Sequence, residues 1–247
     1  MAVQWLLRLD MAFREQNILA VVPARGGSKG IPRKNLREVG GVSLVGRAGQ
    51  LANLLAWIDA RVLSTDDEDI AREGRAHGLD VPFMRPAELS GDLVTSVDMW
   101  RHAWLAAEAH YGMRFDISVL LEPTSPLRTA DDITATVAAL IDGDCKAAAT
   151  VSPAPAHFTP QKCLTVSDGK IGFYHAAGAS HSIRQTIPNY YFRNGICYAL
   201  RRHTLVDEGK VLGDDCAAVV IERPIVNIDE PFDLELAEFL LQRERRV

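Results

Sequence analysis

The 247-residue sequence lacks an apolar run approaching the ~20 residues that a bilayer-spanning helix needs. Its four cysteines lie no closer than eighteen positions apart, which excludes CxxC redox or zinc spacing and gives no sign of a disulfide framework. Basic residues are outnumbered, with 27 Lys and Arg against 32 Asp and Glu and a net charge of −5, which argues against nucleic acid or a membrane as partner. We therefore expect a cytoplasmic protein with reduced core thiols, in which any phosphate binding is local.

With 47% hydrophobic and 24% charged residues, the chain has the composition of an ordinary globular protein. Residues 1–16 contain a short apolar stretch that Arg8 and Asp10 interrupt, and no small-residue cleavage site follows it. We predict an N-terminal extension without assigned function rather than a signal peptide. Met1 and Met11 are alternative starts of the natural chain.

From residue 17 onward, short β-branched runs alternate with longer helical patterns. Residues 18–22 form an apolar run bounded by Pro23 and glycines, which is typical of a central strand buried on both faces. Further strands are predicted at 61–64, 117–121 and 147–151, and helices at 43–57, after a capping box at 65–68, at 95–111 and from Thr129 to about 141. This order predicts an α/β fold with a mostly parallel sheet flanked by helices.

Residues 153–188 break this alternation. Prolines, histidines and a turn at 167–170 separate short segments there, with no long helix among them. Regular structure is predicted again at 195–200 and 217–221, and an amphipathic helix starts at Pro231. We therefore predict one domain over residues 17–247 with an inserted segment at about 153–192.

The segment Ala24–Asn35 directly follows the first strand, at the position where open α/β sheets bind ligands. Its three glycines would let backbone N–H groups approach a ligand closely. Five cations are concentrated within thirteen residues, namely Arg25, Lys29, Arg33, Lys34 and Arg37. This composition indicates a polyphosphate cradle, although the segment matches neither a Walker loop nor a GxGxxG fingerprint. The alternative is a basic, solvated loop.

Together with this loop, several motifs in order along the chain from Ile18 resemble those of the acylneuraminate cytidylyltransferases, the CMP-sialic acid synthetases and their relatives. The matching segments are 64–66, 85–89 with Asp92, 123–128, 184–185, 194–195 and 227–229. The resemblance implies a Rossmann-like fold of the nucleotide-diphospho-sugar transferase type. It also implies that the inserted segment serves dimerisation, giving a homodimer with composite active sites.

By this resemblance, the residues that bind CTP would be Arg25, Ser28, Lys29, Lys34, Asn35, Arg85 and Ser96. Attack on the α-phosphorus of CTP gathers charge on the non-bridging oxygens and on the departing pyrophosphate, so fixed cations supply the main stabilisation. Arg25 and Lys34 would therefore be catalytic. On local sequence alone, Arg85 is instead typical of an exposed surface arginine.

The resemblance places the acidic sugar against the 122–128 turn and the inserted segment. The residues that it implies are Glu122, Thr124, Ser125, Lys162, Arg184, Gln185 and Tyr198. Glu122 stands where the family usually has glutamine, and a carboxylate cannot donate hydrogen bonds and would repel the carboxylate of the sugar. We therefore expect a substrate other than N-acetylneuraminate, with a hydroxyl-rich or cationic group facing Glu122. The plainer interpretation of this segment is a proline-rich turn.

Asn227 and Asp229 are separated by one residue, so on a strand they would share a face and reach one magnesium ion. The family commonly has aspartate at both positions, and Asn227 can offer only an uncharged amide oxygen. Asp229 would then be the main metal ligand and a catalytic residue. Local sequence equally supports Asp229 as the N-cap of the helix that starts at Pro231.

The resulting hypothesis is a magnesium-dependent enzyme that transfers CMP from CTP to the anomeric hydroxyl of a nonulosonic acid and releases pyrophosphate. Two alternatives remain. Asn227 and Glu122 motivate a catalytically weakened nucleotide-sugar binding or regulatory module. A cytidylyltransferase for a 3-deoxy-octulosonate-type sugar is the other, although those enzymes usually carry an aspartate where this chain has Thr124.

Overall fold

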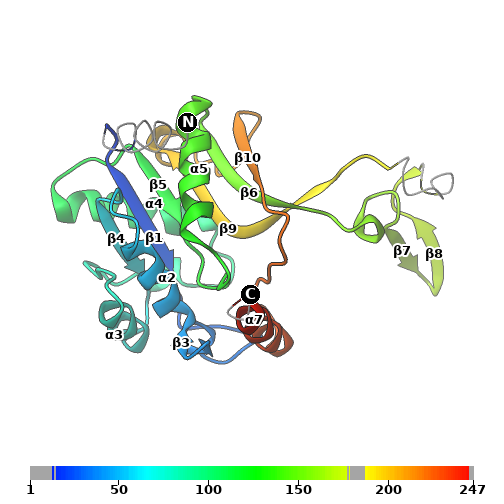
Figure 1. Ribbon diagram of the computed structural model, residues 1–247, viewed down its shortest axis with the longest axis horizontal. Coiled ribbons are helices and arrows are strands. Elements are labelled where there is room, and N and C mark those ends of the chain that lie inside the picture. The colour runs from blue at the N-terminus through cyan, green and yellow to red at the C-terminus, as the bar shows by residue number, and fades with distance from the viewer. Residues whose placement is uncertain (1–12, 14, 177, 179–186, 245–247) are drawn as a thin grey trace. The chain divides into compact units, whose positions relative to one another are not determined.

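The computed structural model describes residues 13, 15–176, 178 and 187–244. Its main feature is a six-stranded sheet with the strand order β10-β6-β9-β5-β1-β4 (Figure 1). The strands are β1 (Ile18–Pro23), β4 (Ala60–Ser64), β5 (Ile117–Leu120), β6 (Ala147–Pro153), β9 (Tyr191–Arg201) and β10 (Cys216–Val220). The α-helices are α2 (Leu44–Asn53), α3 (Glu68–Ala76), α4 (Ser96–Tyr111), α5 (Ala130–Asp142), α6 (Arg202–Val206) and α7 (Pro231–Glu244).

Strand β1 lies inside the sheet because its apolar side chains are buried on both faces. Residues 18–22 have no exposed surface. The strand pairs in parallel with β4 on one side and with β5 on the other, and β5 pairs antiparallel with β9. Because parallel strands end at the same edge, the segments that follow β1, β4 and β5 emerge side by side. The predicted α/β fold with a mostly parallel sheet is confirmed.

Helices cover both faces of the sheet. Leu19 and Val21 of β1 pack in one core cluster with Trp100 and Trp104 of α4. The alternate residues of β1 point to the opposite face, as the pleat of a strand requires. In Figure 1, α2 and α5 lie in front of the strands and α4 lies behind them.

The cap predicted at Thr129 is confirmed: Thr129 caps α5 in a capping box with Asp132. Thr95 caps α4. Helix α3, in contrast, is capped by Asp67, whose carboxylate accepts the amides of the next turn. The predicted cap at Thr65 is wrong because the Thr65 hydroxyl accepts the Asp67 amide ahead of the helix instead.

Helix α2 is shorter than the predicted 43–57. It ends at Asn53, whose side-chain amide donates to the carbonyl oxygens of Gly49 and His77. Leu54 then lies outside the helix and is 73% exposed. Two short strands, β2 (Glu38–Val39) and β3 (Val42–Ser43), form a hairpin before α2.

The chain divides into two compact units. The first contains the described parts of residues 1–150, 194–219 and 224–247, and the second contains those of 151–193 and 220–223. Within the second unit, β7 (Leu164–Ser167) and β8 (Lys170–Phe173) form an antiparallel hairpin, and the described residues contain no α-helix. The hairpin turns at Asp168 and Gly169, both with positive φ.

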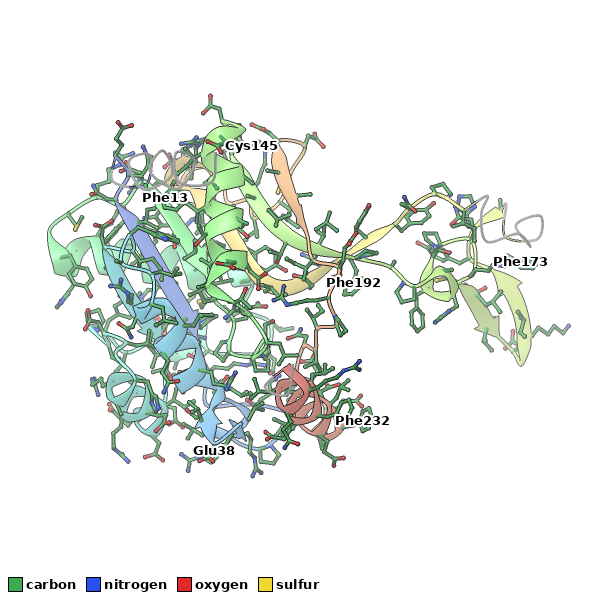
Figure 2. All side chains as sticks on the ribbon, viewed as in Figure 1. Phe13, Glu38, Cys145, Phe173, Phe192 and Phe232 are labelled. Carbon is green, nitrogen blue, oxygen red and sulfur yellow. The ribbon has the colours of Figure 1, made fainter. Side chains whose placement is uncertain are left out.

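The thiols are free, but only one lies in the core. Cys197 on β9 is fully buried, and burial raises its pKa to about 12. Cys145, Cys163 and Cys216 are half-buried because they lie at or just before the starts of strands; Cys145 is labelled in Figure 2. The prediction of four core thiols is therefore wrong for three of them. None of the described helices is both long and apolar enough to cross a membrane.

Candidate active site

A cavity of about 390 Å³ in the first unit collects most of the candidate site residues. The loop after β1 and the turn after β5 both contribute, because both emerge at the carboxyl edge of the sheet. The lining residues are Pro23, Arg25, Ser28, Lys29, Gly30, Lys34, Asn35, Arg85, Met99, Glu122, Pro123, Thr124 and Asp229. Nine of these are candidates from the sequence, drawn from four separate segments of the chain.

The loop at residues 24–37 is fixed at its base by backbone hydrogen bonds. The amide of Ala24 donates to the carbonyl of Ser64, which ties the end of β1 to the end of β4 at 2.9 Å. Asn35 is buried, and its side-chain amide donates to the Arg25 carbonyl at 3.0 Å. The structural part of Asn35 is therefore to hold the backbone of Arg25 in place.

The glycines of this loop serve packing more than ligand approach. A methyl group on Gly30 would lie 2.4 Å from the carbonyl oxygen of Asp229, so the loop and the 227–229 segment meet where only glycine fits. The amide of Gly26 donates to Asp66 Oδ1 at 2.9 Å. A methyl group on Gly27 would meet nothing within 4 Å. The expectation that all three glycines open N–H groups to a ligand is wrong for Gly26.

Carboxylates accompany the cations of the loop. Asp92 pairs with both Arg25 and Lys29, at 3.1 and 2.7 Å, and Lys29 in particular holds the pKa of Asp92 below its usual range. Lys34 Nζ lies 3.1 Å from Asp229 Oδ1. Two further cations turn away from the cavity: Arg33 pairs with Asp69 and Arg37 donates to the Pro32 carbonyl. Three of the five predicted cradle cations therefore line the cavity.

Arg85 is a buried residue, and the interpretation as a surface arginine is wrong. Its side chain donates to the hydroxyl and the carbonyl oxygen of Ser64, at the end of β4. Burial lowers the pKa of Arg85 to about 10, against the opposing effect of Asp66. The guanidinium is still charged at neutral pH and faces the cavity from a fixed position.

The 122–128 turn is held by a buried arginine. The guanidinium of Arg128 donates to the carbonyls of Glu122, Gly195 and Ile196 and is only 7% exposed. Burial lowers the pKa of Arg128. The hydroxyl of Ser125, also buried, donates to the Gly195 carbonyl at 2.9 Å. The turn is thus fastened to β9, and this function of Arg128 was missed from the sequence.

Gly195 lies where the turn and β9 meet. Its φ of 71° is in the left-handed region, in the middle of a strand. A methyl group there would lie 3.0 Å from Glu122 Oε2. The Glu122 side chain therefore lies beside β9, and it also lines the cavity.

The 227–229 segment is not a strand, and that part of the prediction is wrong. The chain is nevertheless extended enough to alternate, with Asn227 and Asp229 exposed and Ile228 buried. The amide of Ile228 donates to the Thr124 carbonyl at 2.8 Å, which ties the segment to the turn.

The helix-cap interpretation of Asp229 is also not what the structure shows. The amides of Asp229 and Glu230, which precede α7, both donate to Oδ2 of Asp233 in the first turn of the helix. The Asp229 carboxylate contacts Lys34 instead and is 70% exposed. It can therefore reach a ligand in the cavity.

The donor set suits a magnesium ion that is shared with phosphates. In the described parts of the chain, no group of three or more His, Cys, Asp or Glu side chains is placed to hold a metal. Magnesium commonly takes one or two protein carboxylates and completes its shell with phosphate oxygens and water. Asp229, which lines the cavity, fits that requirement, whereas Asn227 is exposed on the same side of the segment but does not line the cavity.

Several predicted site residues do not line the cavity. Ser96 is exposed at the start of α4. Tyr198 is packed in the core cluster around α4, and Ser125 is engaged with β9. Lys162 belongs to the second unit. Arg184 and Gln185 lie outside the described residues.

A sequence model of the cytidylyltransferase family matches residues 19–205. The chain is 27% identical over 226 residues to the CMP-N,N'-diacetyllegionaminic acid synthase of Campylobacter jejuni, covering 91% of this chain and 94% of that protein. It is 28% identical over 225 residues to the pseudaminic acid cytidylyltransferase of the same species, covering 90% and 95%. The fold resembles that of a CMP:2-keto-3-deoxy-manno-octonic acid synthetase complexed with CTP, with a TM-score of 0.66, 18% identity and coverage of 92% and 99%.

Proposed function

The chain belongs to the cytidylyltransferase family and is a nucleotidyltransferase, and from this premise we propose that it transfers CMP from CTP to the anomeric hydroxyl of a nonulosonic acid, releasing pyrophosphate. The observation that carries the proposal is the cavity, which gathers cations from the loop after β1 and polar groups from the turn after β5. Relatives of similar identity are named for legionaminic and for pseudaminic acid, which supports the sugar class.

In this proposal, the cationic side chains that line the cavity bind the phosphates of CTP. The Arg25 and Lys29 side chains are 34% and 77% exposed, whereas Lys34 is 17% exposed and donates to the Ile228 carbonyl. Arg85 is fixed against β4. We expect these four to neutralise the charge that develops on the α-phosphate and on the departing pyrophosphate. Ser28 and Asn35 complete the nucleotide side of the cavity. The protein thereby contributes mainly positioning and fixed positive charge.

Glu122 and Thr124 face the acceptor sugar in this proposal. The Glu122 carboxylate accepts hydrogen bonds and disfavours a second carboxylate beside it. We expect the sugar to present hydroxyl or N–H donors to Glu122 and to turn its own carboxylate elsewhere. Lys162, Arg184, Gln185 and Tyr198 remain predicted partners of the sugar. A legionaminate-like or pseudaminate-like acid suits Glu122 better than N-acetylneuraminate.

Asp229, assisted by Asn227, would hold the magnesium ion. When bound, the metal supplies additional positive charge at the phosphates and lowers the pKa of a coordinated hydroxyl. Lys34 forms an ion pair with Asp229 Oδ1. This contact keeps the Asp229 carboxylate turned toward the cavity. Asp229→Asn should therefore raise the magnesium concentration needed for half-maximal rate, and an unaltered metal titration would remove Asp229 from this role.

We further propose that the protein acts in the cytoplasm as a homodimer. The hairpin of the second unit exposes large apolar side chains, with Val166 at 75%, Ile171 at 71% and Phe173, labelled in Figure 2, at 54%. Such a surface is costly in water and suited to contact with a second copy. A monomeric mass in solution at micromolar concentration would contradict the dimer.

Pyrophosphate release from CTP and magnesium is the test of the activity. It is measured with N-acetylneuraminate, legionaminate, pseudaminate and 3-deoxy-octulosonate, with controls that omit sugar or metal. We expect sugar-dependent release, greatest with legionaminate or pseudaminate and strongly reduced in Arg25→Ala. Tight CTP binding without release from any sugar would instead favour the weakened binding module. Release with 3-deoxy-octulosonate alone would move the enzyme to that substrate.

A further inference from the structure

Asp92 forms two ion pairs with cations of the proposed triphosphate site, and the mechanism above gives it no role. Its Oδ1 lies 3.1 Å from Arg25 Nη1 and its Oδ2 lies 2.7 Å from Lys29 Nζ. Each oxygen of one carboxylate thus binds a different side chain that lines the cavity. The Asp92 carboxylate therefore binds the two cations, Arg25 and Lys29, that would otherwise be available to a bound phosphate.

The segment around Asp92 touches the loop through its backbone as well. The carbonyl of Gly91 accepts a hydrogen bond from Arg25 Nη1 at 3.2 Å. Beyond these contacts the segment is open to solvent: the Asp92 side chain is 47% exposed and Leu93 is 98% exposed. Solvent-exposed ion pairs of this kind exchange partners at little cost in free energy.

A carboxylate and a polyphosphate cannot both use the same N–H groups of Arg25 and Lys29. The two anions would also repel each other at the short distances that shared cations impose. Arg25 and Lys29 each have further N–H donors, so the repulsion between the anions, more than a shortage of donors, favours release of one or both cations by Asp92 when a triphosphate binds. When the phosphates leave, Asp92 is the nearest anion that can pair with both cations again.

We propose that Asp92 is an intramolecular competitor of the phosphates, which pairs with Arg25 and Lys29 in the nucleotide-free protein, is displaced by the triphosphate and pairs again as pyrophosphate leaves. The identity of the nucleotide rests on the proposed function, whereas the competition itself needs only a polyphosphate. Asp92 is in this sense a positioning residue. It weakens polyphosphate binding and thereby favours release, and it disfavours ligands with too little charge to displace it.

The test compares equilibrium dissociation constants for inorganic pyrophosphate and for CTP, measured calorimetrically on the full chain. Asp92→Asn removes the charge and keeps the size, and Asp92→Glu keeps the charge. Asp142→Asn, at the exposed end of α5, is the matched control for one lost negative charge. Cytidine, which has no phosphate, is titrated as a competitor to report any general damage to the cavity.

We expect Asp92→Asn to bind pyrophosphate and CTP about three- to tenfold more tightly than the wild type, as the loss of two exposed ion-pair partners implies. The gain should shrink at high ionic strength because salt screens exposed charges. Asp92→Glu and Asp142→Asn should stay within twofold of the wild type, a margin of about 0.4 kcal/mol. Cytidine binding should be equal in all variants.

Unchanged or weaker binding of both phosphate ligands by a folded Asp92→Asn protein would overturn the competition, because the carboxylate would then be organising the cations. The same conclusion follows if the wild type binds neither ligand. Tighter pyrophosphate binding in a protein that does not bind CTP would support the competition and contradict the proposed function. If the protein turns over CTP with a sugar acid but Asp92→Asn binds the phosphate ligands no more tightly, the proposed function is supported and the competition is contradicted.

Discussion

At the proposed phosphate end of the cavity, formed by residues 24–37, cations pair with exposed carboxylates. At the proposed sugar end, formed by residues 122–128, buried hydrogen bonds hold the chain. Lys29 and Asp92 form an ion pair with side chains 77% and 47% exposed. Arg128 is 7% exposed and contacts three carbonyl oxygens. Exposed pairs exchange partners readily, but a buried guanidinium cannot leave its partners without a large cost. The phosphate end is thus suited to ligands that come and go, and the sugar end to a fixed shape.

The largest expected effect comes from breaking the sugar end. Arg128→Ala removes the guanidinium from three carbonyl oxygens, of which those of Glu122 and Gly195 keep Ser125 as a donor. Because hydrogen bonds to a buried charged group are strong, we expect the free energy of unfolding to fall by about 3–5 kcal/mol. Urea denaturation measures it. Arg72→Ala is the control, because Arg72 is 75% exposed and pairs with Asp69 at the surface. It should change stability by less than about 0.5 kcal/mol. Equal effects of the two variants would remove the contrast between the ends.

A second variant, at Gly30, tests the one close packing contact described above for the phosphate end, between the loop and the 227–229 segment. Gly30→Ala would place a methyl group 2.4 Å from the Asp229 carbonyl oxygen, so the loop and the 227–229 segment must separate. We expect a cost of about 1–3 kcal/mol in transition-state binding, which is a fall of about 5- to 160-fold in kcat/KM for CTP. Gly27→Ala, whose methyl group meets nothing within 4 Å, should be nearly silent. A loop that tolerates both substitutions equally would mean that this contact does not position Asp229.

The smallest effect concerns pH. Burial and the nearby charge of Arg85 keep the pKa of His102 below its ordinary value of 6.5, although Glu88 acts weakly in the opposite direction. The unfolded chain therefore binds the proton more readily, and stability is full above about pH 6.5 and declines as the pH falls through the lower native pKa. His102→Gln should reduce this acid decline without changing stability at about pH 7.5. Identical acid profiles for the two proteins would assign the decline to other groups.

The local features of the fold could be predicted from the sequence. The apolar run of β1 and the capping box at Thr129 depend on neighbouring residues, and both are confirmed. Errors occurred where a distant partner decides the outcome. Helix α2 ends early because Asn53 contacts a carbonyl 24 residues away. In the candidate site, too, features set by neighbouring residues were predicted and those set by distant partners were not.

Residue types marked the cavity, but not how its residues are held. A basic glycine-rich loop after the first strand was sufficient to select Arg25, Lys29 and Lys34. The burial of Arg85 depends on Ser64, and the fastening of Arg128 depends on β9, so neither could be read from adjacent sequence. The same holds for Asp92, whose two partners lie more than sixty residues earlier in the chain.

A crystal structure of the protein with CTP and no sugar tests the division of the cavity most directly. We expect the phosphates to lie within hydrogen-bond distance of Arg25, Lys29 and Lys34, with Asp92 no longer paired to both cations and the 122–128 turn unchanged. A triphosphate bound against Glu122, or bound elsewhere while Asp92 keeps both ion pairs, would contradict the assignment of the phosphate end.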